Sequence, residues 1–248
     1  MKIDCLIPAR AGSKGILKKN IFPLKKIPLI AYSICVARQS KFIRNVYVST
    51  DSKEIAEIAR DFGALTPFLR PNYLSTDKST DREVFIHFLE SQKIIDLEKS
   101  DYLVHLRPTT PGRKVEIIDK AINDFYKDKN CSSLRSAHLT KNCPFKWFKI
   151  EENYFKPIFQ EDSGLEVHNM PRQMFPEVYI PNGYVDIVKP NIFLNDGVFH
   201  GKKIKVFKTD RTIDIDQLSD LERAEDDKII IELSKFIKSN YGLSFNSL

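Results

Sequence analysis

Cysteine and long apolar runs are both scarce in this sequence of 248 residues. The four cysteines, Cys5, Cys35, Cys131 and Cys143, form no C-x-x-C pair and have no neighbouring histidine at zinc spacing. Buried or free thiols are therefore favoured over disulfides or metal ligands.

No apolar run approaches the roughly 20 residues of a membrane span, and the N-terminal Met-Lys-Ile-Asp lacks the apolar stretch of a signal peptide. We expect a cytoplasmic protein without a membrane partner.

Standard nucleotide-binding and hydrolytic signatures are missing as well. The glycine-containing N-terminal loop matches neither G-x-x-x-x-G-K-[ST] nor G-x-G-x-x-G, so P-loop and dinucleotide fingerprints do not apply. The five histidines show no Ser-His-Asp or metal-ligand spacing, and we assign them no catalytic role. The formal charge of +6 suits nucleic acid or a small polyanion. Because basic residues are scattered except around 14–26, a local grip is favoured over a nucleic-acid track.

The order of apolar runs and amphipathic stretches predicts an α/β fold. With 42% hydrophobic residues, the chain can bury a full core as a single domain over residues 1–248. Strands are expected at 3–9, 43–49, 101–106, 132–137, 184–188 and 203–207, and helices at 28–39, 52–62, 80–95, 114–127 and about 217–238. This alternation indicates a mostly parallel sheet with helices on both faces. Ligands lie beyond the carboxyl ends of such strands, so the loops after residues 9, 50, 70 and 107 should converge.

The N-terminal loop has the composition of a nucleotide-triphosphate grip. Residues 6–20, LIPARAGSKGILKKN, pass from an apolar strand into small residues that let a ligand approach the backbone closely. Successive exposed backbone N–H groups form an anion-binding concavity, and positive charge comes from Arg10, Lys14, Lys18 and Lys19. The alternative is a basic surface turn.

Two aspartates before the last predicted helix form a candidate metal site. In TIDIDQLSD, Asp214 and Asp216 alternate with Ile213 and Ile215, so both carboxylates would lie on one side of an extended segment. Two convergent carboxylates commonly hold Mg²⁺, with water and phosphate oxygens completing its shell. By spacing alone, D-x-D is a weak signal and is more often a solvated turn or a helix cap.

Residues 138–183 interrupt the alternation of strands and helices. This segment contains five prolines, many aromatic residues and the only tryptophan, Trp147, with strand-like pieces near 146–150 and 154–159. An isolated hairpin is marginal in water, so we expect an arm that packs on a second subunit. An arm folded back on its own domain is the alternative.

Five motifs occur in an order that resembles one family. They are LIPARAGSKGILKKN at 6–20, VSTDSKEIAEIARDFGA at 48–64, RPTTP at 107–111, PRQMFPEVYIPNG at 171–183 and TIDIDQLSDLERAE at 212–225. Together they resemble the CMP-sugar-acid synthetases, the cytidylyltransferases that activate sialic acid and related 2-keto sugar acids. The resemblance implies a three-layer Rossmann-like nucleotidyltransferase fold with a small β-rich dimerisation arm. It also implies a homodimer that uses CTP, a sugar acid and Mg²⁺.

The same resemblance implies roles for individual residues. It assigns Arg10 and Lys19 to the triphosphate and its leaving group, and the metal to Asp214 and Asp216. Asp216 or a metal-bound water is the expected proton acceptor. The other nucleotide-binding positions are Ser13, Lys14, Gly15, Asn20, the cytosine-contacting Arg70, and a hydroxyl from Ser79 or Thr80. The sugar-binding positions are Arg107, Arg172, Gln173 and Asn182.

Two positions depart from the family's pattern. Arg107 stands where glutamine is more usual, and Asp81 stands where serine is often present. An arginine fork can grip a carboxylate bidentately, which an amide cannot, so the sugar would differ from plain sialic acid; alternatively, Arg107 faces solvent. Asp81 is expected to cap the following helix.

These observations predict a Mg²⁺-dependent cytidylyltransferase. CTP and a nine-carbon, sialic-acid-like 2-keto sugar acid would give the CMP-sugar and pyrophosphate, with the anomeric hydroxyl attacking the α-phosphorus. One alternative is a cytidylyltransferase for an eight-carbon, Kdo-like acid. Another, from a different class, is a catalytically silent protein that binds nucleotides or nucleic acid.

Overall fold

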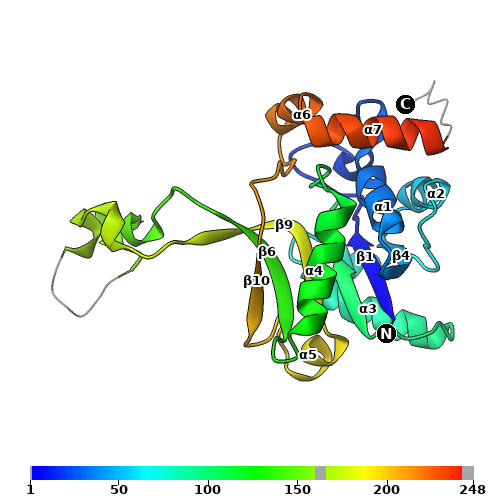
Figure 1. Cartoon of the computed structure of the whole chain (residues 1–248), viewed down its shortest axis with the longest axis horizontal. Coiled ribbons are helices and arrows are strands. Elements are labelled where there is room, and N and C mark those ends of the chain that lie inside the picture. The colour runs from blue at the N-terminus through cyan, green and yellow to red at the C-terminus, as the bar shows by residue number, and fades with distance from the viewer. Residues whose placement is uncertain (1, 160–165, 242–248) are drawn as a thin grey trace.

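A six-stranded sheet forms the centre of the computed structural model, which describes residues 2–159 and 166–241 (Figure 1). Its strands, in spatial order, are β10 (Ile204–Lys208), β6 (Ser133–Leu139), β9 (Tyr179–Val188), β5 (Tyr102–His105), β1 (Ile3–Pro8) and β4 (Ile43–Ser49). β9 runs antiparallel to β5 and β6, whereas the other neighbours pair in parallel. The predicted mostly parallel sheet is confirmed.

Helices cover both faces of the sheet, because side chains along each strand alternate between two hydrophobic cores. On β1, Cys5 and Ile7 point into the larger core, and Leu6 points into the smaller one. The larger core includes side chains of α1 (Leu29–Gln39), α2 (Lys53–Asp61), α4 (Val115–Lys127), α6 (Leu218–Glu225) and α7 (Lys228–Tyr241). The smaller core includes those of α3 (Asp81–Ile94) and α5 (Pro190–Asn195). The result is the expected three-layer α/β architecture.

Short elements complete the body of the protein. β2 (Pro23–Leu24) and β3 (Ile27–Pro28) form a small antiparallel ribbon, and single 3₁₀ turns lie at Lys19–Ile21 and Asn72–Leu74. All four cysteines are free, as expected, and three of them are buried. Within residues 2–159 and 166–241, no helix combines the length and apolar character needed to span a bilayer.

The C-terminal helical region differs from the prediction. One helix was expected over about 217–238, but the chain forms α6 and α7 with a break at Asp226 and Asp227. Asp227 Oδ1 accepts a hydrogen bond from the backbone N–H of Ile230 at 3.0 Å. This capping contact satisfies an N–H group of the first turn of α7, so the second helix begins there.

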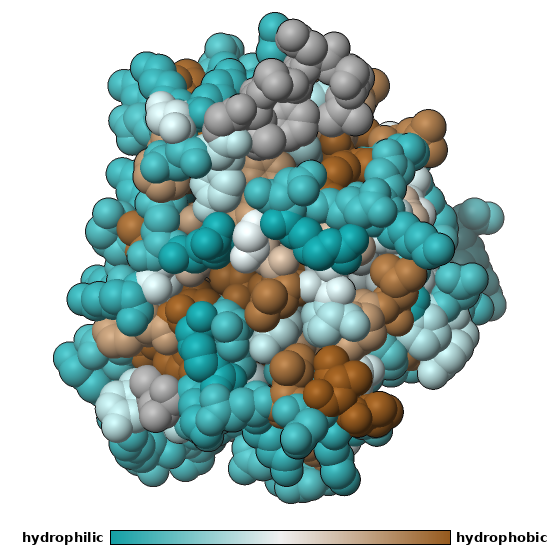
Figure 2. Space-filling view, turned by 90° about the vertical axis from the view of Figure 1, so that its right-hand side faces the viewer, coloured by the Kyte–Doolittle hydropathy of each residue, from teal (hydrophilic) through white to brown (hydrophobic). Residues whose placement is uncertain are grey.

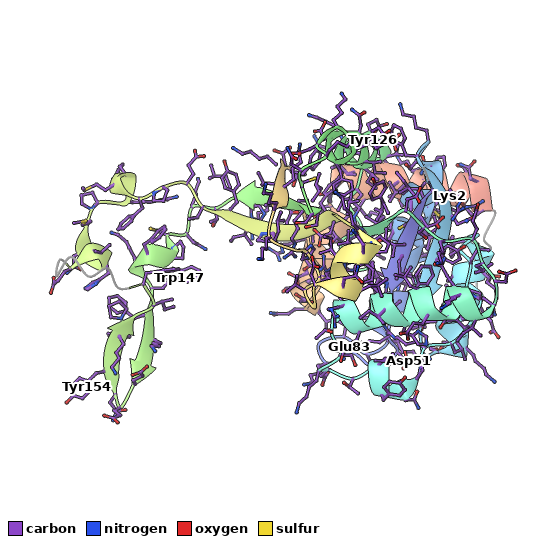
Figure 3. The ribbon with its side chains drawn as sticks, turned by 90° about the horizontal axis from the view of Figure 1, so that it is seen from below. Lys2, Asp51, Glu83, Tyr126, Trp147 and Tyr154 are labelled. Atoms are coloured by element: carbon purple, nitrogen blue, oxygen red, sulfur yellow. The ribbon has the colours of Figure 1, made fainter. Side chains whose placement is uncertain are left out.

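The segment between β6 and β9 extends away from the sheet as an arm (Figures 1 and 3). Its antiparallel hairpin, β7 (Phe148–Glu151) and β8 (Tyr154–Pro157), falls where strand-like pieces were predicted. Three 3₁₀ turns at Pro144–Lys146, Val167–Asn169 and Arg172–Met174 complete the arm. Residues 160–165 of the predicted 138–183 arm lie outside the described residues. The described residues of the arm extend away from their own sheet rather than folding back onto it.

Candidate active site

A cavity of about 610 Å³ opens beyond the carboxyl ends of β1 and β5. The predicted convergence of loops is confirmed for those after residues 9, 70 and 107, all of which line it. The loop after residue 50 supports it from outside, since Asp51 Oδ1 accepts a hydrogen bond from Ala11 N at 2.8 Å. The predicted site residues among the lining are Arg10, Ser13, Lys14, Gly15, Lys19, Asn20, Arg70, Ser79, Arg107 and Asp216.

Hydrogen bonds within the N-terminal loop hold the predicted grip in shape. Ser13 Oγ donates to the carbonyl of Ile16 and accepts from Lys19 N at 3.1 Å. Asn20 Nδ2 donates to the carbonyl of Arg10 at 2.8 Å. A Cβ at Gly15 would lie 2.3 Å from the backbone oxygen of Asp216, so the loop meets the 212–217 segment at a point only glycine can occupy.

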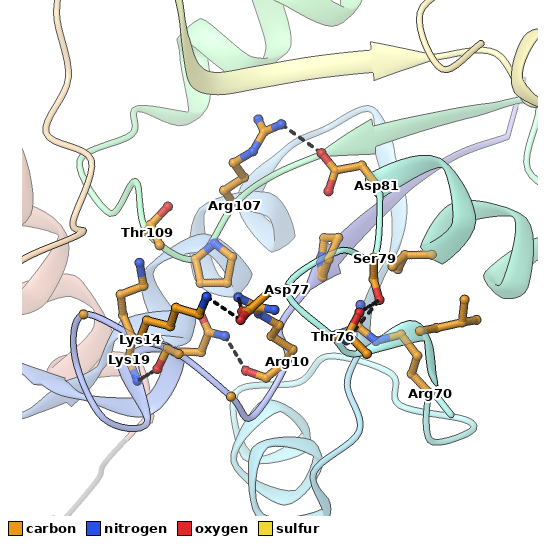
Figure 4. A pocket seen from close by; sticks show the side chains of 18 of the residues that line it. Arg10, Lys14, Lys19, Arg70, Thr76, Asp77, Ser79, Asp81, Arg107 and Thr109 are labelled. Carbon is orange, nitrogen blue, oxygen red and sulfur yellow. Dashed lines mark hydrogen bonds and ion pairs between the residues drawn. The ribbon is translucent and has the colours of Figure 1, made fainter. Parts of the chain in front are cut away.

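The four cations of this loop contact three different carboxylates, two of which line the cavity (Figure 4). Lys19 Nζ lies 2.8 Å from Asp216 Oδ1, whereas Arg10 and Lys14 each lie 2.7 Å from an oxygen of Asp77. Lys18, at a left-handed φ of 53°, instead contacts Glu54 of α2 at 2.8 Å. The expectation that Lys18 adds charge to the grip is therefore wrong.

Asp77 is a cavity residue that the sequence analysis missed. Its carboxylate bridges Arg10 and Lys14 across the cavity, and hydrogen bonds from Lys14 and then Arg10 hold its pKa below the usual range. An exposed acid in a polar loop carries no sequence signal for a partner more than 60 residues away. The consequence is that a triphosphate must replace this carboxylate to bind both cations.

The predicted base-recognition segment supplies one buried cation. Arg70 is only 4% exposed and its Nε donates to Ser75 Oγ at 3.0 Å; burial lowers the pKa of its guanidinium. Ser79 Oγ lies 3.0 Å from Thr76 Oγ1 at the cavity wall.

Thr80 lies outside the cavity lining. It caps α3 instead, in a capping box in which Thr80 Oγ1 accepts a hydrogen bond from Glu83 N at 3.3 Å and Thr80 N donates one to Glu83 Oε2 at 2.7 Å. The cap expected at Asp81 is thus one residue earlier, which leaves the Asp81 side chain free to face the cavity.

Arg107 and Asp81 form an ion pair in the cavity wall (Figure 4). Arg107 Nη2 lies 3.1 Å from Asp81 Oδ2, and Nη1 lies 3.2 Å from Asp186 Oδ2 on β9. Arg107 therefore does not simply face solvent, and its fork is not a free clamp for a substrate carboxylate. Burial raises the pKa of Asp81, but interactions with His105 and Arg107 outweigh it and leave the net pKa low. Burial likewise opposes the charge of Arg107, yet Asp186 and Asp81 raise its pKa.

A second arginine, Arg113, fixes the loop that carries Arg107. It is fully buried, and its five N–H donors serve five acceptors. The acceptors are the carbonyl oxygens of Arg107, Thr110, Gly183 and Tyr184 and the hydroxyl of Ser33. Burial lowers the pKa of Arg113 to about 10. Because these acceptors belong to three separate segments, Arg113 joins α1, β9 and the 107–113 loop.

The two predicted metal ligands line neighbouring cavities. Asp216 lines the main cavity, whereas Asp214 lines a second one of about 460 Å³ together with Asn182. Both aspartates are exposed and Ile215 between them is buried, as the alternation predicted. Within the described residues no cluster of three or more His, Cys, Asp or Glu side chains could hold a metal. The two carboxylates nevertheless supply hard oxygen ligands of the kind that Mg²⁺ takes, with water and phosphate oxygens filling the rest of its shell.

The predicted sugar-binding residues are not together within one chain. Arg107 lines the main cavity, whereas Arg172 and Gln173 line a cavity of about 450 Å³ in the arm, where Arg172 Nη2 donates to the carbonyl of Thr140. Asn182 Nδ2 donates to Thr209 Oγ1 at 2.7 Å, near the base of the arm. A sugar site that uses all four predicted residues would have to combine the linings of three separate cavities.

Sequence comparison identifies the class of protein that this fold and cavity define. The cytidylyltransferase family pattern matches residues 5–154, and the chain belongs to that family. It is 31% identical to the post-translational flagellin modification protein B of Campylobacter coli, over 89% of this chain and 92% of that one. It is 32% identical to the CMP-N,N'-diacetyllegionaminic acid synthase of Legionella pneumophila, over 87% and 91%. The resemblance to CMP-sugar-acid synthetases is thereby confirmed.

A solved structure shares the fold. A CMP:2-keto-3-deoxy-manno-octonic acid synthetase complexed with CTP matches with a TM-score of 0.68, over 91% of this chain and 97% of that one. At 14% identity, this likeness confirms the nucleotidyltransferase fold and nothing finer.

Proposed function

We propose that this protein transfers CMP from CTP to the anomeric hydroxyl of a nine-carbon, sialic-acid-like 2-keto sugar acid and releases pyrophosphate. The observation that carries the proposal is the meeting of Arg10, Lys19 and Asp216 in one cavity with the buried Arg70. Nucleotidyl transfer requires neutralised phosphates, an aligned nucleophile and a stabilised leaving group. These residues offer each of the necessary charges at the carboxyl edge of the sheet.

The grip supplies the electrostatic part of the reaction. Arg10 and Lys14 bind the triphosphate once Asp77 releases them, and Lys19 stabilises the departing pyrophosphate. Arg70 lies at a separate corner of the cavity in Figure 4, where it positions the cytosine. Asp216, whose carboxylate contacts Lys19, takes the proton of the attacking hydroxyl or orients the water that takes it.

The proposal includes Mg²⁺ and a homodimer. Asp214 and Asp216 would hold the ion, which when bound neutralises phosphate charge. Support for the dimer comes from the arm, where the exposed fractions of Tyr154 and Phe155 are 74% and 73%. Such apolar area favours a partner surface, and Arg172 and Gln173 at the arm would then reach the sugar of the neighbouring subunit.

Pyrophosphate release tests the proposal directly. The purified protein is given CTP, ATP, GTP or UTP with N-acetylneuraminic acid, N,N'-diacetyllegionaminic acid or an eight-carbon 2-keto acid. We expect release with CTP and a nine-carbon acid, and at least a 100-fold lower kcat/KM with the other nucleotides. Equal use of all four nucleotides would contradict the role of Arg70. Salt-sensitive binding to random DNA without any transfer would favour the binding-protein alternative.

A preference for the eight-carbon acid would favour the Kdo-like alternative. The structural similarity to the octonic acid synthetase supports that alternative, but this similarity is limited to the fold. The relative named for legionaminic acid matches at higher identity, 32% against 14%. We therefore place the nine-carbon acid first.

A further inference from the structure

The two positions that depart from the pattern of CMP-sugar-acid synthetases contact each other. Asp81 is the first residue of α3, and Arg107 follows β5, 26 residues later. Their side chains form an ion pair of 3.1 Å within the wall of the cavity (Figure 4). Serine and glutamine, the more usual residues, are both neutral. The exchange therefore replaces two neutral groups by two opposite charges.

The charges around this pair are balanced inside the protein. Arg107 contacts Asp186, a fully buried residue of β9, and Asp186 in turn lies 3.5 Å from Arg135 of β6. Two arginines and two aspartates thus form one network with no net charge. A substrate carboxylate placed at Arg107 would meet the carboxylate of Asp81 on the same fork, and like charges repel at this distance. The carboxylate of the sugar acid must bind elsewhere.

The pair still presents polar atoms to the cavity. The Asp81 side chain is 43% exposed and that of Arg107 is 28% exposed. Asp81 uses Oδ2 for Arg107, so Oδ1 can accept a hydrogen bond from a ligand. A guanidinium has five N–H donors, and these two ion pairs involve one Nη each. The wall therefore offers an acceptor and a donor to an uncharged part of the substrate.

We propose that Asp81 and Arg107 act as one specificity-determining unit for the sugar acid. Asp81 accepts a hydrogen bond from an amide N–H or a hydroxyl on an uncharged substituent, and Arg107 positions Asp81 and donates to a neighbouring oxygen. The substrate class is a 2-keto sugar acid whose substituents facing α3 are neutral and include a hydrogen-bond donor. This inference rests on the proposed function, because it presumes that the cavity binds a sugar acid beside CTP.

The pair also explains why neither departure stands alone. Arg107→Gln by itself leaves Asp81 and the buried Asp186 without their shared cation, and an unpaired buried charge is costly. Asp81→Ser by itself leaves Arg107 with excess charge toward the cavity. The double change restores a neutral wall, so its effects should be strongly non-additive.

A double-mutant cycle with separate KM values for the two substrates tests the proposal. Asp81→Ser, Arg107→Gln and the double variant are compared with the wild type, using CTP with N,N'-diacetyllegionaminic acid or N-acetylneuraminic acid. We expect Arg107→Gln to raise the sugar-acid KM at least tenfold while the CTP KM stays within twofold. The double variant should be less impaired than Arg107→Gln, and its ratio of kcat/KM between the two sugars should change at least tenfold.

A matched ion pair outside the cavity provides the control. Asp128 and Lys205 lie 3.0 Å apart with similar exposures, 35% and 30%. Asp128→Ser/Lys205→Gln should leave both KM values and the sugar ratio unchanged. Thermal unfolding of every variant identifies any that fails to fold, and the Asp81→Asn variant, which keeps the shape of the side chain, then takes the place of Asp81→Ser.

The possible failures are distinguishable. Absence of turnover with every sugar acid in the wild type would overturn the proposed function and this inference with it. Turnover with additive effects, or with an unchanged sugar ratio in the double variant, would overturn the inference alone. A CTP KM that rises as much as the sugar-acid KM would place the pair in the nucleotide site instead.

Discussion

The cavity and the arm differ in whether their side chains find partners within the same chain. In the cavity, charged groups find partners within the chain, such as Lys19 with Asp216 and Arg107 with Asp81 and Asp186. In the arm, some rings pack on one another, but Ile150, Tyr154 and Phe155 are exposed by 71%, 74% and 73%. Figure 3 shows Trp147 and Tyr154 on this arm, far from the body that carries Asp51 and Glu83.

The face of the body opposite the arm is covered mainly by hydrophilic residues, with apolar ones in separate patches (Figure 2). Exposed apolar area gathered on one projecting segment is typical of an interaction surface. A stable interface buries about 800 Å² per partner, so the proposed dimer requires the exposed apolar side chains of the arm to contribute to such an area. The difference teaches that residues of one chain line the cavity, whereas the arm exposes apolar side chains that the proposed dimer would cover. Substitutions in the cavity should therefore change chemistry and leave the oligomeric state unaltered.

The largest effect is expected at Asp216, a cavity residue whose substitution should change the chemistry and leave the oligomeric state unaltered. Asp216→Asn should lower kcat by roughly 10²–10³-fold, because a carboxylate that contacts Lys19 in the cavity becomes neutral. Its side chain is 67% exposed, so thermal stability should change little. Steady-state pyrophosphate release at limiting Mg²⁺ measures the change in kcat, and thermal unfolding measures the change in stability. Near-normal turnover would remove Asp216 from the metal and catalytic assignments.

The next effect concerns stability rather than chemistry. Arg113→Lys offers three donors to five acceptors, so at least two buried acceptors lose their partner at about 1–3 kcal/mol each. We expect the free energy of unfolding to fall by about 3 kcal/mol, measured by urea denaturation. Lys120→Arg, at an exposed position on the neighbouring helix α4, serves as a charge-conserving control. A change below about 1 kcal/mol would show that Arg113 is not what joins β9 to the 107–113 loop.

Arg10 and Lys18 provide a matched pair of loop cations. Arg10→Ala should lower kcat/KM for CTP by roughly 10–100-fold, since it removes a charge-assisted contact to phosphate. Lys18→Ala should change it less than about threefold, because Lys18 makes an exposed ion pair with Glu54 outside the cavity. Initial rates at varied CTP distinguish the two. Equal losses would mean that Lys18 turns toward the nucleotide.

The smallest effect is expected at Asp77. Exposed ion pairs contribute little because water and salt screen them, so Asp77→Asn should release Arg10 and Lys14 and tighten CTP binding by no more than about fivefold. Calorimetric titration at low salt measures this gain, which salt should reduce. Weaker binding in the variant would indicate that Asp77 contributes to the nucleotide complex rather than competing with it.

Local patterns in the sequence predicted most of the fold. The first four helices and five of the six sheet strands fall within about two residues of their predicted ranges, since apolar periodicity reports burial directly. The sixth strand, β9, was expected at 184–188 but begins five residues earlier, at Tyr179, and α5 and the β2–β3 ribbon were not predicted. The break between α6 and α7 was missed, although Asp227 three residues before Ile230 is a recognisable cap signal. The cap of α3 was placed at Asp81 instead of Thr80, a one-residue error that concealed the orientation of Asp81.

Long-range pairings could not be predicted. Nothing local to Asp77 indicates Arg10 or Lys14 as its partners, and nothing local to Arg107 indicates Asp81 or Asp186. The left-handed backbone at Lys18 likewise turns a cation out of the grip for a reason that its residue type does not reveal. Motif spacing identified which residues approach the cavity, and the partners of each charge required the fold.

The central claim is that the cavity of one subunit and the arm of another form a single site, and subunit mixing tests it most directly. Asp216→Asn and Arg172→Ala subunits carrying different tags are co-expressed, and the mixed dimer is isolated and assayed for CTP-dependent pyrophosphate release. One of its two sites combines an intact cavity with an intact arm, so we predict about half of the wild-type activity per dimer while each parent dimer is inactive. A mixed dimer as inactive as its parents, or an active protein that is monomeric at every concentration, would contradict the claim.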